Sequence, residues 1–341
     1  MLDVVWADID GTQITVNALV YLLWFIWVGW IFSTVGAFGG IMAGVGHLSV
    51  FGIGDWAAKM KGVKVNIPGY TDAGKYLTDT IRFGNSVQTW FNAIASTINW
   101  QMQKRLVWPA GISLGIGGVL GAQVGVWVTG GQVAAAVYMG IFGLATYLIA
   151  GYMIYQLTPR AKRSKKAGKE AAQRFQQKVK ELREQGKLHE LEGIRNLKVS
   201  LTATTFDFYG ESFKLSNYSP LIVGFLIGFF SAVIGIGGGF LYVPYLTSLG
   251  LPFYIVPGAS VLAVLLTQTS AAAAWLMKGV LYPIGLLIAG WIGLFIGSYI
   301  GPRTQKYIPQ DYLFVLFAIL AIYVGSGYVT RGFFGIRLPG V

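Results

Sequence analysis

The sequence contains no cysteine and little charge. Of its 341 residues, only 12% are Asp, Glu, Lys or Arg, against about 25% in a typical soluble domain. Without cysteine, neither a disulfide framework nor a thiolate metal or redox site can form. The chain is instead 54% hydrophobic and holds 47 glycines, which indicates an integral membrane protein.

Acidic side chains are missing from the long apolar runs. Within 84–158 and 219–330, the only Asp, Glu, Lys or Arg residues lie near predicted segment ends: Lys104, Arg105, Lys278, Arg303, Lys306 and Asp311. Cation pumps and many proton-coupled carriers place carboxylates inside their spans. The sequence therefore disfavours a cation site and favours an anion held by neutral donors. A membrane-embedded enzyme or redox anchor is also disfavoured, and no catalytic residue, metal or cofactor is expected.

Hydrophobic segments of membrane-spanning length recur along the chain. A bilayer core of ~30 Å needs about 20 apolar residues per helix. Uncharged runs occur near 85–103, 106–157, 257–277, 279–302 and 312–330, and two longer runs, 14–54 and 215–277, are divided by glycine and proline. The pattern predicts roughly eight hydrophobic segments.

A stretch in the first half of the chain resembles one in the second half. The stretch FSTVGAFGGIMAGVGHLSVFG at 32–52 aligns without gaps with FSAVIGIGGGFLYVPYLTSLG at 230–250. A weaker pair, 84–111 and 258–285, follows in the same order, and the difference in offset predicts a polar insertion over 54–83. We therefore expect two homologous membrane repeats, 1–157 and 218–341.

A basic linker separates these repeats. Residues 158–217 supply most of the chain's net charge of +12, and Ala172, Phe175, Val179 and Leu182 recur at helical spacing. A solvated amphipathic helix is the first interpretation, and docking on anionic lipid headgroups is the second. Nucleic-acid binding is not expected, because no recognition motif accompanies the charge.

Charge also predicts the orientation in the cytoplasmic membrane. A linker this basic should be cytoplasmic, whereas the acidic N-terminal tail fits the outside. Each repeat then crosses the bilayer an odd number of times. The fold class that follows is an all-α polytopic membrane protein with two inverted-topology repeats, each a glycine-broken helical hairpin plus three transmembrane helices. Both termini are expected outside.

Glycine breaks inside apolar runs suggest a ligand site. Irregular backbone at membrane depth persists only where it is buried in protein or lines an aqueous cavity, and a helix that restarts there points free N–H groups at an anion. Close helix packing is the alternative use of such glycines. The candidate residues are Gly39, Gly40, Gly237, Gly238 and Gly239.

Polar side chains on the segments after each hairpin are candidate donors. Asn85, Asn92, Ser96 and Asn99 fall near one helical face. The complete predicted set is Asn85, Ser86, Asn92, Ser96, Ser260, Thr267, Gln268 and Ser270. Amide and hydroxyl groups donate hydrogen bonds without a permanent buried charge, although bonds between helices are their common alternative role. His47 is a further candidate, as a proton-coupling group, a substrate donor or a structural residue.

These motifs resemble the TauE/SafE sulfite/anion exporter family, also called 4-toluene sulfonate uptake permeases. The resemblance covers about 14–157 and 219–331. The second hairpin, FSAVIGIGGGFLYVPYLTSLGLP, carries it better than the first, which has Gly-Gly-Ile at 39–41 and Gly46 in place of the proline. Neither the linker nor the insertion belongs to the common pattern.

The resemblance implies a transporter of sulfite, sulfonates, sulfoacetate or related anions across the cytoplasmic membrane. Its expected partners are a small anion and the lipid bilayer; anionic lipid at 158–217 stays the second interpretation of the linker's charge. The alternatives are a carrier for carboxylates or another small anion and an anion channel. The substrate itself, its direction and the coupling ion are not set by the sequence.

Overall fold

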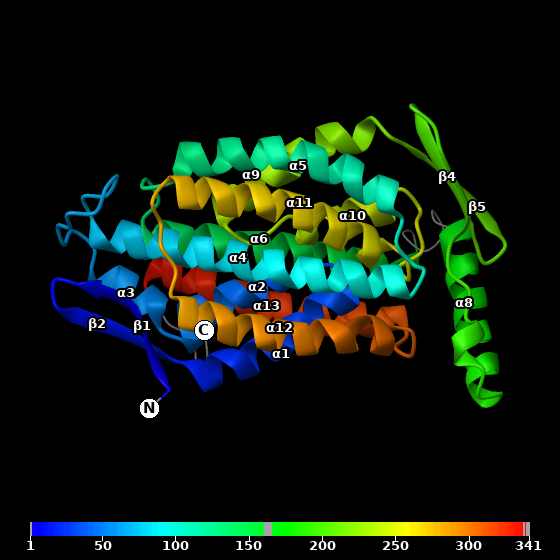
Figure 1. The fold of residues 1–341 in the computed structure, drawn as a ribbon, viewed down its shortest axis with the longest axis horizontal. Coiled ribbons are helices and arrows are strands. Elements are labelled where there is room, and N and C mark those ends of the chain that lie inside the picture. The colour runs from blue at the N-terminus through cyan, green and yellow to red at the C-terminus, as the bar shows by residue number, and fades with distance from the viewer. Residues whose placement is uncertain (1, 160–165, 337, 339–341) are drawn as a thin grey trace.

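A bundle of long helices forms the body of the molecule. The computed structural model describes residues 2–159, 166–336 and 338, and its long helices lie side by side (Figure 1). They are α1 (Ala18–Val35), α4 (Ala73–Met102), α5 (Trp108–Thr129), α6 (Ala135–Leu157), α9 (Ser219–Ile234), α11 (Val256–Met277), α12 (Ile284–Gln305) and α13 (Gln310–Phe334). Six helices among the described residues, namely α1, α5, α6, α11, α12 and α13, are long and apolar enough to span a bilayer. The expected polytopic helical membrane fold is confirmed.

Glycines let neighbouring helices approach closely. A Cβ atom at Gly117 or Gly121 of α5 would collide with the backbone of α9, and one at Gly293 or Gly297 of α12 would collide with the backbone of α1. In each pair the glycines are four residues apart, so they lie on one helical face. Contact between backbones gives helices in lipid the close packing that the hydrophobic effect does not supply there.

Each of the two predicted repeats contains a broken helical hairpin. In the first, α1 is followed by a break at residues 36–38 and by α2 (Gly39–Val45) and the π-helix η1 (Gly46–Val50); in the second, α9 is followed by residues 235–238 and α10 (Gly239–Ser248). The two breaks touch, because the backbone of Ile236 leaves no room for a Cβ at Gly40 and the carbonyl oxygen of Gly36 lies 2.6 Å from where a Cβ of Gly239 would be.

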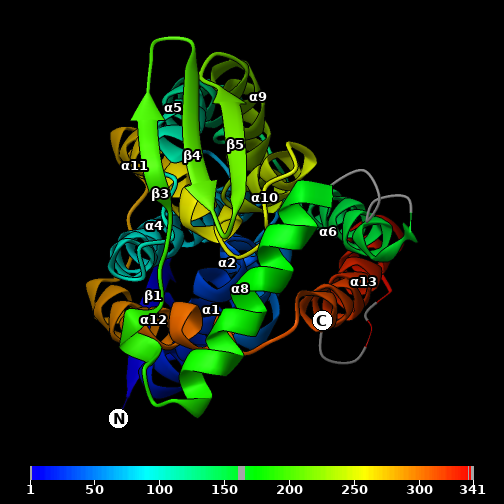
Figure 2. The ribbon, with the colours of Figure 1, turned by 90° about the vertical axis from the view of Figure 1, so that its right-hand side faces the viewer.

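Small extramembrane elements occupy opposite ends of the bundle (Figure 1). One end, called the hairpin end below, carries the antiparallel strands β1 (Asp3–Ile9) and β2 (Thr12–Asn17) and the helix α3 (Ile53–Lys59). The other, called the linker end, carries α8 (Lys166–Glu184), the short helix η2 (Leu188–Glu190) and the antiparallel sheet of β3 (Arg195–Val199), β4 (Ala203–Phe208) and β5 (Glu211–Ser216). Viewed from the linker end, α8 lies across the bundle in front of α1 and α2 (Figure 2).

The linker is a small packed unit. Its helix α8 buries Ala171, Phe175, Val179 and Leu182, whereas Ala172, assigned to the apolar face by spacing, is only half-buried. The ring of Phe175 lies 5.6 Å from that of Phe208 on β4 and 4.7 Å from that of Tyr254 in the bundle. The apolar face of α8 is thus covered by protein, and its charged residues remain on the outside.

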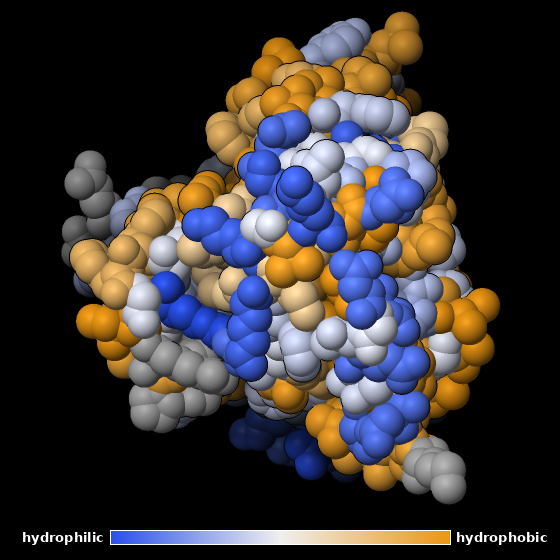
Figure 3. All heavy atoms as spheres, turned by 90° about the vertical axis from the view of Figure 1, so that its left-hand side faces the viewer, coloured by the Kyte–Doolittle hydropathy of each residue, from blue (hydrophilic) through white to orange (hydrophobic). Residues whose placement is uncertain are grey.

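The region predicted as a polar insertion, 54–83, divides into two parts: α3 with the loop after it, and the beginning of α4. Its last residues form the beginning of α4, whose N-cap is Asp72: the side chain accepts a hydrogen bond from the backbone N–H of Lys75, the usual way to satisfy a free N–H at a helix start. At the hairpin end of the molecule, hydrophilic residues gather across the middle and apolar residues lie toward the margins (Figure 3). That distribution fits an end facing water and sides facing lipid.

Candidate functional site

The crossing of the two breaks lies between α4 and α11. Gly237 has φ +72°, and a Cβ there would lie 3.2 Å from Cγ2 of Thr89 on α4 and 3.4 Å from Nε2 of Gln268 on α11. Only a glycine adopts this backbone conformation without strain. The break therefore brings the backbone of Gly237 next to two polar side chains in the interior.

Several polar atoms at this crossing have no partner. Oγ1 of Thr89, Nδ2 of Asn92 and Oε1 of Gln268 are buried and make no hydrogen bond. Asn92 lies one turn beyond Thr89 on α4, and its other amide atom, Oδ1, accepts a hydrogen bond from Ser96 at 3.3 Å. A buried polar group without a partner costs about 1–3 kcal/mol. A polar ligand that paired with these atoms would offset that cost.

The other predicted donors in the second repeat have different surroundings. Ser260 donates to the Gly36 carbonyl at 2.6 Å and so holds the first break in place. Thr267 donates to the carbonyl of Ala263, and its hydroxyl also meets that of Tyr242 at 2.7 Å. Ser270 donates to the Val119 carbonyl of α5 at 2.8 Å. The structure therefore brings Gln268 to the crossing, places Ser260 and Thr267 in support of the hairpins, and places Ser270 at a helix–helix contact.

His47 forms a second polar cluster toward the hairpin end. Its Nδ1 lies 2.6 Å from Oδ1 of Asn85, and its Nε2 lies 2.8 Å from the hydroxyl of Tyr21 and 3.0 Å from that of Tyr282. An amide oxygen only accepts, so this network assigns the proton to Nδ1 and makes Nε2 the acceptor of a phenolic O–H. Ser86, next to Asn85 on α4, is buried but is not part of this cluster.

Aromatic side chains complete the His47 cluster, and sequence reasoning missed them. Tyr21 and Tyr282 hydrogen-bond to each other as well as to His47. Trp6 of β1 covers both His47 and Tyr282, with ring centroids 5.1 and 5.0 Å apart. These residues come from β1, α1 and the α11–α12 connection, so only the folded chain brings them together.

An ion pair inside α4 was also missed. Nη1 of Arg82 lies 2.8 Å from Oδ1 of Asp79, and neither side chain is exposed. Arg82 also donates to the carbonyl of Ala232 at the end of α9 and stacks on Trp275, 4.6 Å from its ring. Both residues fall in the region predicted as a polar insertion, so the sequence gave no reason to expect the Asp79 carboxylate inside a long helix. The pair carries no net charge, so it does not turn the interior into a cation site.

The chain matches the model of the sulfite exporter TauE/SafE family over residues 21–328. No curated protein and no solved structure gave a match. Among the residues that the structure describes, no group of three or more His, Cys, Asp or Glu side chains could hold a metal ion. The matched region runs from the first helix of the bundle almost to the end of the last one and includes both glycine breaks. This multi-pass membrane protein therefore belongs to the sulfite exporter TauE/SafE family.

Proposed function

We propose that the protein is a secondary carrier or facilitator that moves small sulfur-containing anions, such as sulfite, sulfonates or sulfoacetate, across the cytoplasmic membrane. The family supports transport of such an anion. The observation that carries the proposal to a site is the set of unpartnered buried atoms on Thr89, Asn92 and Gln268 beside the Gly237 break. The free Nδ2 of Asn92 and the hydroxyl of Thr89 can donate to oxyanion oxygens directly, and rotation of the Gln268 amide would present its Nε2. None of these donors carries a fixed charge, which permits release as well as binding.

The arrangement of the repeats supports alternating access around this crossing. Helix α1 of the first repeat packs on α12 of the second, and its counterpart α9 packs on α5 of the first. The first repeat begins at the hairpin end and the second at the linker end, as halves with inverted topology would. Rocking of such halves exposes a midplane site to one side and then to the other. With a cytoplasmic linker, the hairpin end faces outward.

In this proposal, His47 couples proton and anion movement. Its Nε2 accepts from a tyrosine when neutral and becomes a donor when protonated, so uptake of one proton reorganises the contacts of Tyr21 and Tyr282. Asn85 ties the same ring to α4, the helix that carries Thr89 and Asn92. A change in protonation at His47 is thereby linked to the helix that lines the proposed anion site.

Flux of radiolabelled sulfite and sulfoacetate into proteoliposomes, compared with a dicarboxylate, tests the substrate class. We expect saturable flux of the sulfur anions, reduced about tenfold or more by Asn92→Ala or Gln268→Ala because each removes a hydrogen-bonding group from the proposed site. Ser270→Ala, which loses only hydroxyl bonds to Val119 and Gln123 of α5, is the matched control and should retain most of the flux. Preferential dicarboxylate flux would redirect the assignment to carboxylates, and a conductance far above carrier turnover would indicate a channel.

A further inference from the structure

A second buried arginine lies at the linker end. Arg105, in the connection between α4 and α5, is 1% exposed. Its Nη1 donates to Oε1 of Gln305 at 2.9 Å and its Nη2 to the carbonyl of Pro302 at 2.7 Å, while its Nε is buried without a partner. Burial lowers the pKa of the Arg105 guanidinium to about 9, which still leaves it protonated at neutral pH.

Arg105 differs from Arg82 in having no counter-ion. Both stack on a tryptophan near the end of a long helix, Arg82 on Trp275 and Arg105 on Trp100 at 4.5 Å. Arg82 is neutralised by Asp79, whereas no carboxylate among the described residues forms an ion pair with Arg105. A buried charge without a partner is costly in a folded protein, so this position calls for an anion.

Neighbouring cations add to the positive charge around Arg105. Arg303, in the last turn of α12, donates to Oδ1 of Asn99 at 2.6 Å. Lys306 follows at the end of the same helix, and its pKa is lowered first by burial and then by repulsion from Arg105 and Arg303. Mutual repulsion of this kind is relieved when an anion binds among the cations.

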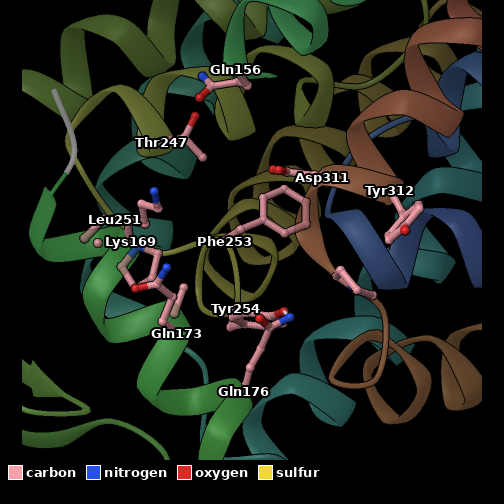
Figure 4. A pocket seen from close by; sticks show the side chains of 14 residues that line it. Gln156, Lys169, Gln173, Gln176, Thr247, Leu251, Phe253, Tyr254, Asp311 and Tyr312 are labelled. Atoms are coloured by element: carbon pink, nitrogen blue, oxygen red, sulfur yellow. Dashed lines mark hydrogen bonds between the residues drawn. The ribbon is translucent and has the colours of Figure 1, made fainter. Parts of the chain in front are cut away.

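A cavity of about 350 Å³ lies between α8 and the bundle. Lys169, Gln173 and Gln176 of α8 line one side, and Thr247 and Phe253 line the other (Figure 4). Gln176 lies beside Tyr254 at one edge of the cavity (Figure 4) and hydrogen-bonds to its hydroxyl. The space is large enough for a small hydrated oxyanion, and its lining is of mixed charge, since it includes the carboxylate of Asp311 as well as the ammonium of Lys169.

Two aromatic rings stand between this cavity and Arg105. Tyr254 lines the cavity, and the ring of Phe175 lies 4.7 Å from it. Arg105 also contacts Phe175: its Cζ lies 5.4 Å from the ring. Since Phe175 belongs to α8, a displacement of that helix would remove one ring and break the Gln176 bond to the other.

On the other side of Arg105, a series of close backbone contacts leads to the first glycine break. Gly258, in the first turn of α11, lies against the carbonyl of Arg105, where a Cβ would come within 2.9 Å of the oxygen. Gly36 lies against Pro257 in the same turn. Arg105 is therefore between the α8 cavity and the crossing of the two breaks.

We propose that Arg105 is an anion-binding site at the linker-end mouth of the transport path, closed in this structure by the Phe175–Tyr254 ring pair. The ligand is a small oxyanion of the class proposed for transport, so the identity of the ligand rests on the proposed function. Opening requires α8 to move away from Arg105 and exposes its Nε to the incoming anion. The linker then acts as a gate for this mouth.

The site is tested by sulfite flux in proteoliposomes that contain the full chain. We expect Arg105→Gln to raise the KM for sulfite about tenfold or more, because a charge-assisted hydrogen bond is lost, and Arg105→Lys to restore most of the affinity. Arg174→Gln, which removes an equal charge from the exposed side of α8, should behave as wild type. If Arg105 only joined the end of α12 to the α4–α5 connection, Lys would not rescue Gln, and that result would overturn the site.

The gate is tested by labelling, because the native chain has no cysteine. An anionic methanethiosulfonate should modify Arg105→Cys slowly and at least about tenfold faster once Phe175→Ala is added. Phe206→Ala removes a buried ring of the linker sheet that stacks on Phe213 and should leave the rate unchanged. Equal rates in all three proteins would overturn the gate.

Failure of the two proposals is distinguishable. If wild type carries sulfite and neither Arg105 variant alters its KM, the mouth site is wrong and the proposed function stands. If wild type neither carries sulfite nor gains thermal stability from it in detergent, the proposed function and the ligand class assigned to Arg105 both fail.

Discussion

Gly237 shows how a single residue position joins fold and site. Its φ of +72° turns the chain between α9 and α10, and its missing side chain leaves the space next to Thr89 and Gln268. The positive φ shapes the backbone, and the missing side chain leaves room beside the proposed anion site. A substitution here affects both, so a control with equal backbone strain is needed.

We expect Gly237→Ala to abolish most anion flux. The added methyl would lie 3.2 Å from Cγ2 of Thr89, which crowds the proposed site, and an L-residue at positive φ adds about 1–2 kcal/mol of strain. Gly62→Ala is the matched control, because Gly62 has φ +81° with nothing within 4 Å of a Cβ. Flux in proteoliposomes and thermal unfolding in detergent are measured together. Equal loss of flux in both variants would attribute the effect to strain alone.

At the residue scale the sequence singled out candidate groups but not the partners that the fold gives them. The glycines of both breaks and Asn92 and Gln268 could be chosen because polar or flexible residues in apolar runs have a cost in lipid. Thr89 could not be separated from other hydroxyl residues. Tyr282 could not be chosen either, because its partners His47 and Tyr21 are more than 200 positions away in sequence.

At the scale of elements, the β1–β2 hairpin is a cover for the His47 cluster. Trp6 is 5% exposed and is anchored by a hydrogen bond from its Nε1 to Oγ1 of Thr80 at 3.0 Å. Its ring contacts both His47 and Tyr282. The hairpin therefore restricts access to the cluster from the hairpin end.

Removing this cover should expose His47 to reagents. In a His189→Gln background, in which His47 is the only histidine, we expect Trp6→Ala to speed modification of His47 by diethylpyrocarbonate about tenfold or more. Val5→Ala changes a neighbouring side chain that is 40% exposed and should have little effect. Mass spectrometry of the modified peptide gives the rate. Slow modification in both variants would show that other residues exclude the reagent.

The extramembrane elements were the least predictable part of the fold. Helical spacing predicted α8, including Phe175, Val179 and Leu182, because its apolar stripe is continuous. The strands were missed, although Phe206 and Phe208 of β4 alternate with half-buried residues and Phe213 and Leu215 of β5 alternate with exposed ones. Short runs with a period of two carry little signal beside long apolar helices, and charge dominated the interpretation of the linker.

At the scale of the whole molecule, the internal sequence repeat predicted that the two glycine breaks would meet. Two copies of one glycine-rich motif were expected to meet near the midplane, and the Gly36–Gly40 and Gly235–Gly239 segments do touch inside the bundle. The sequence could not supply the pairing of α1 with α12 and of α5 with α9. That pairing depends on which glycine faces come into contact across the two repeats, and spacing within one helix does not specify its partner.

The two extramembrane units lie at opposite ends of the bundle, so we expect them on opposite sides of the membrane, and a labelling experiment decides which side each one faces. Gln13 on β2 and Gln185 after α8 are both exposed. Because the native chain has no cysteine, replacing either one by cysteine gives a single-cysteine variant. We expect a membrane-impermeant maleimide to label Gln13→Cys in intact cells and Gln185→Cys only after permeabilisation, because the basic linker is retained in the cytoplasm. Ile336→Cys, just beyond α13, should label with Gln13→Cys, since Arg331 of α13 pairs with Asp55 of α3 at the hairpin end. Labelling of Gln185→Cys in intact cells would reverse the orientation and place the Arg105 mouth outside.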